Sequence, residues 1–268
     1  MGKPQILLTN DDGILSPGLW AAAAALAELG YVYVVAPRDQ YSGAGRSLPN
    51  TSDGLIDVRQ VEVNGQVWEV HAVGGTPAQA VLHGVLEIMP SRPDLVVSGI
   101  NYGENLGFGI TVSGTVGAAM EAAAMGIPAL AVSLETEVQY HLSYSKEIAF
   151  STAAYFTKYF GSLLLEKRML PDVHLLKLDI PLNATPQTDW VITRLSPSRY
   201  FEPVRPNRAK WEEPARVGYR QVFDPALDPR GTDVYVLRVE KKVSLTPLSL
   251  DMTARVDFRD LDNLLRRA

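Results

Sequence analysis

The stretch Gln5-Ile6-Leu7-Leu8-Thr9-Asn10-Asp11-Asp12-Gly13 decides how the rest of the sequence is interpreted, because a short apolar run leads directly into two adjacent carboxylates. The apolar run predicts a buried strand over residues 5–9, which the polar turn 10–13 ends. Ser16-Pro17-Gly18 then supplies an N-cap and a proline at the first helical position for an alanine-rich helix over 19–29. A buried strand followed at once by a capped helix is typical of α/β proteins.

The same alternation of strand and helix continues outward from this stretch. Further strands are expected at 31–36, 94–98, 127–134 and 174–180, and helices at 77–89, 115–125 and about 146–167. Two segments of alternating polarity, 56–63 and 66–73, predict a hairpin with a type I′ turn at Asn64-Gly65. Apolar strands separated by helices predict a mostly parallel sheet that is covered by helices on both faces.

The chain changes character beyond Pro181. Prolines recur at positions 186, 197, 203, 206, 214, 225 and 229, and strand-like pieces occur at 190–195 and 233–239. This texture favours an extended arm or hairpin over a second compact domain. We therefore expect one domain over residues 1–268, with an α/β core at about 1–182 and a C-terminal extension at about 183–268.

The composition excludes several classes of protein. Twenty-five basic and thirty acidic residues give a net charge of −5 without a long run of like charge, which argues against nucleic-acid duplex binding and a membrane-surface role. The sequence has no cysteine, so disulfides and thiolate zinc sites are excluded. No apolar stretch approaches the roughly 20 residues of a membrane span, and the first apolar run is too short for a secretory signal. We expect a cytoplasmic protein.

Three polar loops follow predicted strands, at residues 10–13, 39–47 and 99–115. Because the carboxyl ends of parallel strands share one edge of the sheet, we expect these loops to converge on one site. Asp11 and Asp12 favour a hard divalent cation there, since two buried carboxylates need a counter-charge. A solvated turn is the alternative for this tetrapeptide, because Asp-Asp-Gly is also good turn chemistry.

The other two loops supply mainly neutral groups. The glycines and hydroxyls of 39–47 suit backbone binding of an anion, with Arg46 as a phosphate contact, and a flexible surface loop is the alternative. Asn101 and Asn105 offer neutral ligands for a metal or a phosphate. Ser113-Gly114-Thr115 lies where a helix N-terminus would face an anion, although simple N-capping also accounts for it. Together the loops predict a metal-and-phosphate site.

Longer blocks of the sequence occur in a recognisable order. They are Ile6-Leu7-Leu8-Thr9-Asn10-Asp11-Asp12-Gly13, Ser42-Gly43-Ala44, Ser98-Gly99-Ile100-Asn101, Ser113-Gly114-Thr115-Val116-Gly117-Ala118-Ala119, Gly231-Thr232-Asp233 and Val243-Ser244-Leu245-Thr246-Pro247-Leu248. Over nearly the whole chain, this order resembles the SurE family of survival-protein nucleotidases. The resemblance implies a Rossmann-like, three-layer α/β/α fold and a homodimer or homotetramer formed through the C-terminal arm. It also implies one divalent ion per subunit, Mg²⁺ or Mn²⁺, with Ca²⁺ as a substitute in a crystal.

The resemblance also implies roles for individual residues. The implied metal ligands are Asp11, Asp12, Ser42 and Asn101. The implied phosphate and substrate contacts are Asn10, Ser42, Gly43, Asn105, Ser113, Gly114 and Thr115. Asp11, Asp12 and Asn101 would act in catalysis. The chain departs from the family pattern at Val112, where tyrosine is common, and at Lys177-Leu178-Asp179, where Asn-Val-Asn is usual.

These features give an expected activity and two alternatives to it. The expected activity is metal-dependent hydrolysis of nucleoside monophosphates, 5′-phosphates first and 3′-phosphates second, to nucleoside and phosphate. The first alternative is a nucleotide-binding regulatory or assembly protein that keeps the pocket without turnover. The second is a glycosyltransferase-like domain that uses the aspartates to hold a metal and a nucleotide sugar.

Overall fold

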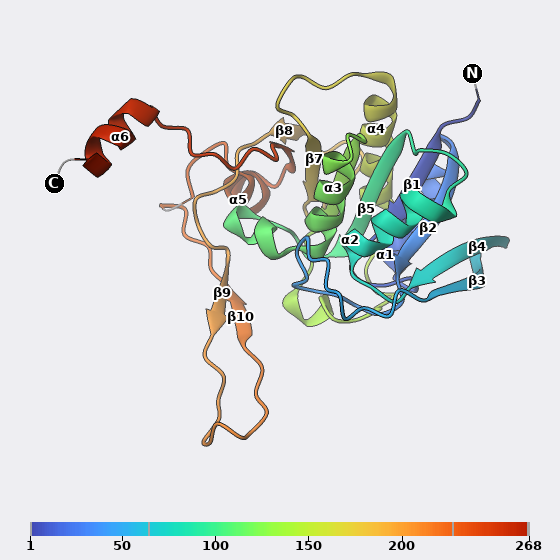
Figure 1. The fold of residues 1–268 in the computed structure, drawn as a ribbon, viewed down its shortest axis with the longest axis horizontal. Helices are drawn as coiled ribbons and strands as arrows, with labels where there is room; N and C mark the ends of the chain where they lie inside the picture. The colour runs from blue at the N-terminus through green and yellow to red at the C-terminus, as the bar shows by residue number, and fades with distance from the viewer. Residues whose placement is uncertain (1, 64, 227, 267–268) are drawn as a thin grey trace.

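The computed structural model describes residues 2–63, 65–226 and 228–266, and a nine-stranded sheet forms its centre (Figure 1). The strands of this sheet, in the order in which they lie side by side, are β3 (Ile56–Val63), β4 (Gln66–Val73), β2 (Tyr31–Pro37), β1 (Gln5–Thr9), β5 (Leu95–Tyr102), β6 (Ala129–Leu134), β7 (Leu175–Ile180), β11 (Val243–Leu248) and β8 (Trp190–Ile192). A separate two-stranded ribbon consists of β9 (Phe201–Val204) and β10 (Gly218–Gln221).

Helices cover both faces of the sheet. The α-helices are α1 (Pro17–Leu26), α2 (Pro77–His83), α3 (Gly114–Ala124), α4 (Ser151–Glu166), α5 (Asp233–Tyr235) and α6 (Phe258–Arg266). Two π-helical turns continue α2 and α5, namely η1 (Gly84–Ile88) and η4 (Val236–Glu240), and two 3₁₀ turns are η2 (Gly107–Val112) and η3 (Val138–Tyr140).

The side chains of β1 show how the three layers are built. Ile6 and Leu8 pack in one apolar core with α1 and α4, whereas Leu7 packs in the opposite core with α2 and α3. Successive residues of a strand point to opposite faces, so a wholly apolar strand must lie between two layers of helices. β1 pairs in parallel with β2 and β5, and β6 and β7 extend the parallel sheet. The predicted α/β/α fold with a mostly parallel sheet is therefore confirmed.

Local sequence explains where the helices start. α2 begins with a capping box, because Thr76 accepts a hydrogen bond from the N–H of Gln79, and the Gln79 side chain accepts one from the N–H of Thr76. Ser113 starts α3 in a similar way, since its Oγ accepts the N–H of Val116 at 3.1 Å. Pro17 is the first residue of α1, as predicted for a proline at this position, but the helix ends at Leu26 rather than at residue 29.

Other predicted boundaries are also wrong in position. β5 continues to Tyr102 instead of ending at residue 98, with a register shift against β6 between Ser98 and Asn101. α4 begins at Ser151 rather than near residue 146. The predicted hairpin of β3 and β4 is confirmed, but Asn64 of its predicted type I′ turn lies outside the described residues.

The predicted strand at 233–239 is wrong in type, because this segment forms the helical turns α5 and η4. Thr232 caps the first turn by accepting the N–H of Tyr235. Val234 and Leu237 are both buried. A spacing of three positions is compatible with one face of a helix, although the apolar run is also compatible with a strand. The N-cap at Thr232 favours the helix.

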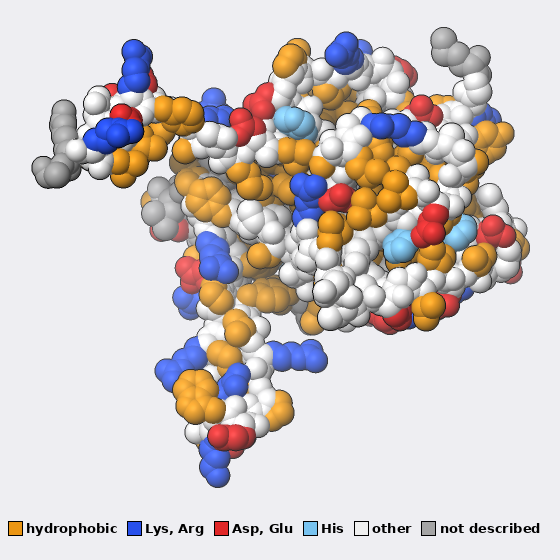
Figure 2. Space-filling model, viewed as in Figure 1, with side chains coloured by type: hydrophobic (Ala, Val, Ile, Leu, Met, Phe, Trp, Pro, Cys, Tyr) orange, Lys and Arg blue, Asp and Glu red, His pale blue; other side chains and the backbone are white. Residues whose placement is uncertain are grey.

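The segment beyond residue 182 belongs partly to the body and partly to two projections. β11 pairs antiparallel with β7 and parallel with β8, so both strands complete the main sheet. The predicted C-terminal hairpin is confirmed as the β9–β10 ribbon, which projects from the body, and α6 stands apart on an extended stretch of chain (Figures 1 and 2). In the described part of the chain, no helix combines the length and the apolar character needed to cross a membrane.

Candidate active site

A cavity of about 930 Å³ lies at the carboxyl edge of the parallel strands. The residues predicted for the site that line this cavity are Asp11, Ser42, Gly43, Asn101, Asn105 and Ser113. They come from the loops after β1 and β2, from the end of β5 and the loop that follows it, and from the start of α3. The expected convergence of the three loops is therefore present in the structure. The β9–β10 ribbon adds a further wall, to which Phe201 and Tyr219 contribute.

Asp11 is almost completely buried, at 4% exposure, and is held by α3. The Thr115 hydroxyl donates a hydrogen bond of 2.5 Å to Asp11 Oδ1. The backbone of Gly114 lies so close that a Cβ there would be 2.7 Å from Asp11 Cβ, which explains the glycine at this position. Burial raises the pKa of Asp11, against the opposing effect of the Thr115 hydrogen bond.

Asp12 lies next to it and is equally buried, at 1% exposure. Its Oδ2 accepts the N–H of Tyr102 at 3.2 Å, and its Oδ1 accepts a hydrogen bond of 3.2 Å from Gln40 Nε2. Gln40 Nε2 also donates to the carbonyl of His141 at 2.9 Å, which ties this carboxylate to the loop after β6. Burial, followed by the neighbouring charge of Asp11, raises the pKa of Asp12 well above its usual value.

Two adjacent buried carboxylates without a protein cation form a site that suits a divalent ion. Within the described residues, neither Asp11 nor Asp12 forms an ion pair with a lysine, arginine or histidine, and burial opposes the ionised form of both. The same part of the chain has no group of three or more His, Cys, Asp and Glu side chains placed to hold a metal. A metal here would therefore depend on neutral oxygen ligands beside the aspartate pair.

Asn101 is placed to supply such a ligand. The register shift in β5 turns the strand just before this residue, as β-bulges next to active sites commonly do. Asn101 Nδ2 donates to the carbonyls of Gly103 at 2.7 Å and Tyr102 at 3.2 Å. The amide nitrogen is thereby committed to backbone carbonyls, and the amide oxygen is the atom that would bind a hard cation.

The loop after β2 brings Ser42 and Gly43 to the cavity. The N–H of Tyr41 donates a hydrogen bond of 2.7 Å to the carbonyl of Asp11, which fixes this loop to the end of β1. Gly43 has a φ of +82°, a conformation that favours glycine, and no atom lies within 4 Å of the place where a Cβ would be. The open space beside Gly43 leaves the backbone accessible to a ligand.

Several predicted contacts lie beside the cavity rather than on its lining. The Asn10 side chain closes the turn, because its Oδ1 accepts the N–H of Gly13 and its Nδ2 donates to the carbonyl of the same residue. Gly114 and Thr115 contact Asp11 instead of the cavity. Arg46, predicted as a phosphate contact, pairs at 2.6 Å with Glu121 of α3 and anchors its own loop.

The wall formed by the ribbon was not predicted from the sequence. His141 Nδ1 lies 3.1 Å from the Tyr219 hydroxyl, and the two rings stack at 6.2 Å with 19° between their planes. Glu104 lines the cavity between Asn101 and Asn105, and burial raises its pKa to about 7. Its Oε1 accepts hydrogen bonds of 2.8 Å from Tyr200 and Gln221. Glu104 lies inside the predicted loop 99–115, and this position is the sequence feature that could have pointed to this wall.

Comparison with known proteins places these features in a family. The family profile described as "Survival protein SurE" matches residues 6–202. The chain is 43% identical over 267 residues to the 5′-nucleotidase SurE of Thermococcus gammatolerans, covering 97% of this chain and 96% of that protein. It is 42% identical over 264 residues to the 5′-nucleotidase SurE of Thermococcus kodakarensis, covering 97% of this chain and 98% of that protein.

A solved structure agrees with the sequence matches. The fold is similar to the crystal structure of the SurE protein from Aquifex aeolicus, with a TM-score of 0.74 and 31% sequence identity over 97% of this chain and 98% of that chain. The region matched by the family profile contains the aspartate pair, the loops after β2 and β5, and the start of α3. Profile, relatives and fold agree that the chain belongs to the SurE family.

Proposed function

We propose that this protein is a divalent-metal-dependent phosphomonoesterase that hydrolyses nucleoside 5′-monophosphates, with 3′-monophosphates as a second substrate class. The observation that carries the proposal is the pair of buried carboxylates, Asp11 and Asp12, beside a cavity whose lining includes hydroxyl and amide side chains. Relatives at 42–43% identity over nearly their whole length bear the name 5′-nucleotidase, which supports a nucleotide substrate.

The donor set fits one hard divalent ion per chain, Mg²⁺ or Mn²⁺. Asp11 and Asp12 supply the negative charge, while the Ser42 hydroxyl and the Asn101 amide oxygen are neutral ligands of the type that these ions accept. When bound, such an ion supplies positive charge to the phosphoryl oxygens and makes a water molecule more acidic. In this proposal Asp11, Asp12 and Asn101 are the catalytic residues.

Residues of the chain hold the phosphate and keep the carboxylates in place. The backbone at Ser42 and Gly43, the Asn105 side chain, and Ser113 at the start of α3 surround the proposed phosphate position. N–H groups at the start of a helix and the helix dipole both favour an anion there. Thr115 and Gln40 orient the two aspartates through the hydrogen bonds described above, so each carboxylate is held in one geometry before substrate binds.

The rest of the cavity suits the nucleoside. About 930 Å³ is typical of a site for a small organic molecule rather than for phosphate alone. Phe108, Phe201 and Tyr219 line it, and Phe108 and Tyr219 keep part of their surface exposed. Aromatic rings provide stacking surfaces for nucleobases with little preference for one base over another. We assign the nucleoside to this aromatic wall.

The direct test is phosphate release from a panel of nucleoside 5′- and 3′-monophosphates, with Mn²⁺, with Mg²⁺ and with excess chelator. We expect release that needs the metal and that is lost in folded Asp11→Asn and Asp12→Asn variants. Asp260→Asn, an exposed carboxylate on α6, is the matched control and should keep full activity. Nucleotide binding without metal and without turnover would instead support the regulatory or assembly protein.

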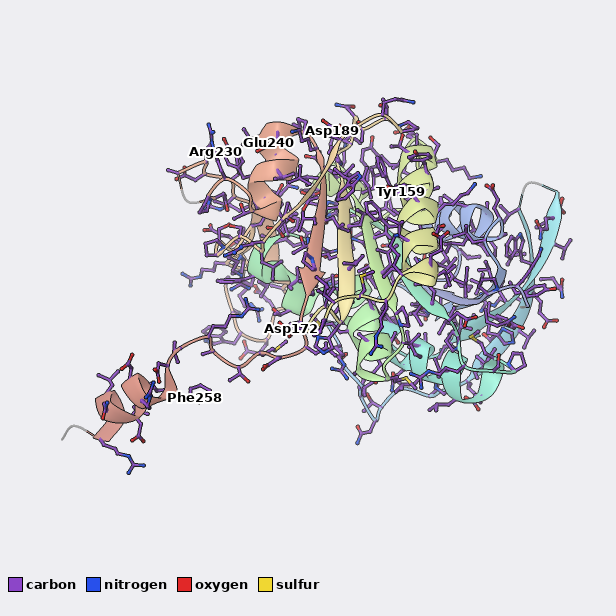
Figure 3. All side chains as sticks on the ribbon, turned by 90° about the horizontal axis from the view of Figure 1, so that it is seen from above. Tyr159, Asp172, Asp189, Arg230, Glu240 and Phe258 are labelled. Atoms are coloured by element: carbon purple, nitrogen blue, oxygen red, sulfur yellow. The ribbon has the colours of Figure 1, made fainter. Side chains whose placement is uncertain are left out.

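We also propose that the protein forms a homodimer or homotetramer through its C-terminal extension and that it works in the cytoplasm. α6 exposes the apolar side chains Phe258, Leu261, Leu264 and Leu265, each between 41% and 75% exposed. Figure 3 shows Phe258 on this helix, well away from the body of the molecule. A second copy of the chain that covers this face would remove the exposed apolar surface from water.

A further inference from the structure

A lysine lies completely buried beneath the loop that carries Asn105. Lys177 belongs to the central strand β7, and its side chain has 0% exposure. Its ammonium group contacts the carboxylate of Asp179, lies 3.2 Å from Asp233 Oδ2, and donates a hydrogen bond of 2.8 Å to the carbonyl of Asn105. Both aspartates are equally buried. Burial lowers the pKa of Lys177, but the two carboxylates outweigh it and the net shift is upward.

The two aspartates of this cluster hold the same loop from below. Asp179 Oδ1 accepts the N–H of Asn105 at 2.8 Å, and Asp233 Oδ2 accepts the N–H of Gly107 at 3.0 Å. Both the N–H and the carbonyl of Asn105 are thus bound to charged side chains. Hydrogen bonds to charged groups are stronger than those between neutral groups, so this loop is fixed more firmly than an ordinary surface loop.

Asn105 itself connects the cluster to the cavity. Its side chain lines the cavity, and its Nδ2 lies 2.8 Å from the Ser133 hydroxyl. A shift of the Asn105 peptide would move this side chain relative to the aspartate pair. A buried ion pair is poor evidence of stabilisation, because the cost of desolvating its charges can exceed their attraction. Its contacts with the Asn105 backbone indicate a different use, the placement of a substrate-binding loop.

We propose that Lys177 is a positioning residue for substrate phosphate, because its ammonium group fixes the Asn105 peptide from beneath the cavity. The inference rests on the proposed function, in which Asn105 contacts the phosphate. In this role Lys177 contacts neither the substrate nor the metal. The role predicted for it is to keep the Asn105 side chain at the correct distance from the phosphate bound near Asp11.

The test compares two variants that differ only at Lys177. Asp179→Asn keeps an oxygen for the Asn105 N–H, loses the oxygen that accepts from Lys177, and leaves Lys177 bound to Asp233 and to the carbonyl of Asn105. Lys177→Met/Asp179→Asn removes one positive and one negative charge together, so it avoids leaving two unpaired carboxylates inside the protein. Lys158→Met, which removes the partly exposed ion pair between α4 and Glu28, is the matched control for loss of a lysine.

The readouts are the Ki of inorganic phosphate as a competitive inhibitor, KM and kcat, and Mn²⁺ affinity. We expect Lys158→Met to remain close to the unmodified protein. Asp179→Asn should raise the Ki less than the double variant does, because it keeps both an acceptor for the Asn105 N–H and the Lys177 ammonium group. In the double variant we expect the Ki and the KM to rise roughly 10- to 100-fold, the range usual for residues that orient ligands. Mn²⁺ affinity should be unchanged, because Asp11, Asp12 and Ser42 come from other loops. The fourth proposed ligand, Asn101, lies within β5 and is held by its own hydrogen bonds to Tyr102 and Gly103. Equal phosphate Ki values in the double variant and Asp179→Asn would overturn the inference.

Two further measurements cover a double variant that does not fold and a protein that shows no phosphatase activity. If the double variant does not fold, Lys177→Gln in the Asp179→Asn background supplies a shorter, neutral side chain, and a Ki equal to that of Asp179→Asn overturns the proposal. If the unmodified protein releases no phosphate from any nucleotide, the proposed function fails by itself. Calorimetric binding of inorganic phosphate in the presence of Mn²⁺ then still compares the variants. Equal affinities would overturn the role of Lys177, and weaker binding in the double variant would support it.

Discussion

The Thr115 hydroxyl donates a hydrogen bond of 2.5 Å to Asp11 Oδ1, which joins the start of α3 to the end of β1 across 104 positions of the chain. This contact orients one of the two proposed metal-binding carboxylates. It also shows that Thr115, a predicted phosphate contact, binds a proposed metal ligand and does not itself line the cavity. In metal sites, groups that orient a ligand are commonly as consequential as the ligand itself.

Thr115→Val should weaken the metal site while leaving the fold intact, because valine keeps the shape of the side chain and removes the hydroxyl. We expect the Mn²⁺ concentration for half-maximal activity to rise about 10-fold. The control is Thr157→Val, which removes a buried hydroxyl bonded to the carbonyl of Ala153 inside α4. An unchanged Mn²⁺ requirement in Thr115→Val would show that this hydrogen bond does not tune the site.

Tyr219→Ala should reduce nucleotide affinity without affecting phosphate affinity, because Tyr219 lies in the wall assigned to the nucleoside. Loss of a stacking contact predicts a rise in KM for nucleoside monophosphates of about 10-fold. The Ki of inorganic phosphate should stay the same, and Tyr219→Phe should keep most of the affinity. Trp211→Ala removes an aromatic side chain, 85% exposed, from the same projection but outside this cavity, and should change neither constant. Parallel loss of nucleotide and phosphate affinity in Tyr219→Ala would contradict the assignment.

Glu104 predicts a pH dependence of stability with a defined sign. Its pKa in the folded protein is about 7, against a usual value of 4.5, chiefly because the carboxyl group is buried. A raised carboxyl pKa means that the unfolded chain loses its proton first, so stability falls as the pH rises from 4.5 to about 7. Between pH 5 and pH 8, the free energy of unfolding should fall by up to about 3 kcal/mol relative to Glu104→Gln. Urea unfolding at several pH values checks this, and a difference that does not vary with pH would refute it.

The C-terminal helix predicts a change in assembly. α6 has nine residues and buries no side chain in the chain described here, and a helix of that length has little stability alone in water. Leu261→Asp/Leu264→Asp should therefore reduce the molar mass measured by light scattering to that of a monomer. Asp260→Asn, on the same helix, should leave it unchanged. An unaltered mass in the double variant would show that α6 does not hold the subunits together.

The part of the site at the carboxyl edge of the sheet was predictable because short segments of the sequence specify it. Asp11 and Asp12 follow the first strand directly, and Ser113 precedes a helix, so the parallel-sheet rule brings their loops together. Ser113 caps α3, which is the alternative to anion binding considered above. Ser113 also lines the cavity, so capping the helix and contacting an anion do not exclude each other.

The rest of the site depends on contacts that no short segment reveals. Asp233 reaches the N–H of Gly107 across 126 positions, from a segment whose apolar texture predicted a strand. Tyr219 reaches the cavity from a proline-rich region that showed only an extended character. Lys177 was visible as a departure from the family pattern, but its position beneath Asn105 required the register of β7 in the assembled sheet.

The proposed function requires Asp11 and Asp12 to bind one divalent ion together. Calorimetric titration of Mn²⁺ into the protein, and into Asp12→Asn with Asp260→Asn as control, tests this claim without relying on turnover. We predict one bound ion per chain in the unmodified protein and in Asp260→Asn, and no saturable binding in Asp12→Asn. Binding of equal affinity in Asp12→Asn, or no binding in the unmodified protein, would contradict the account.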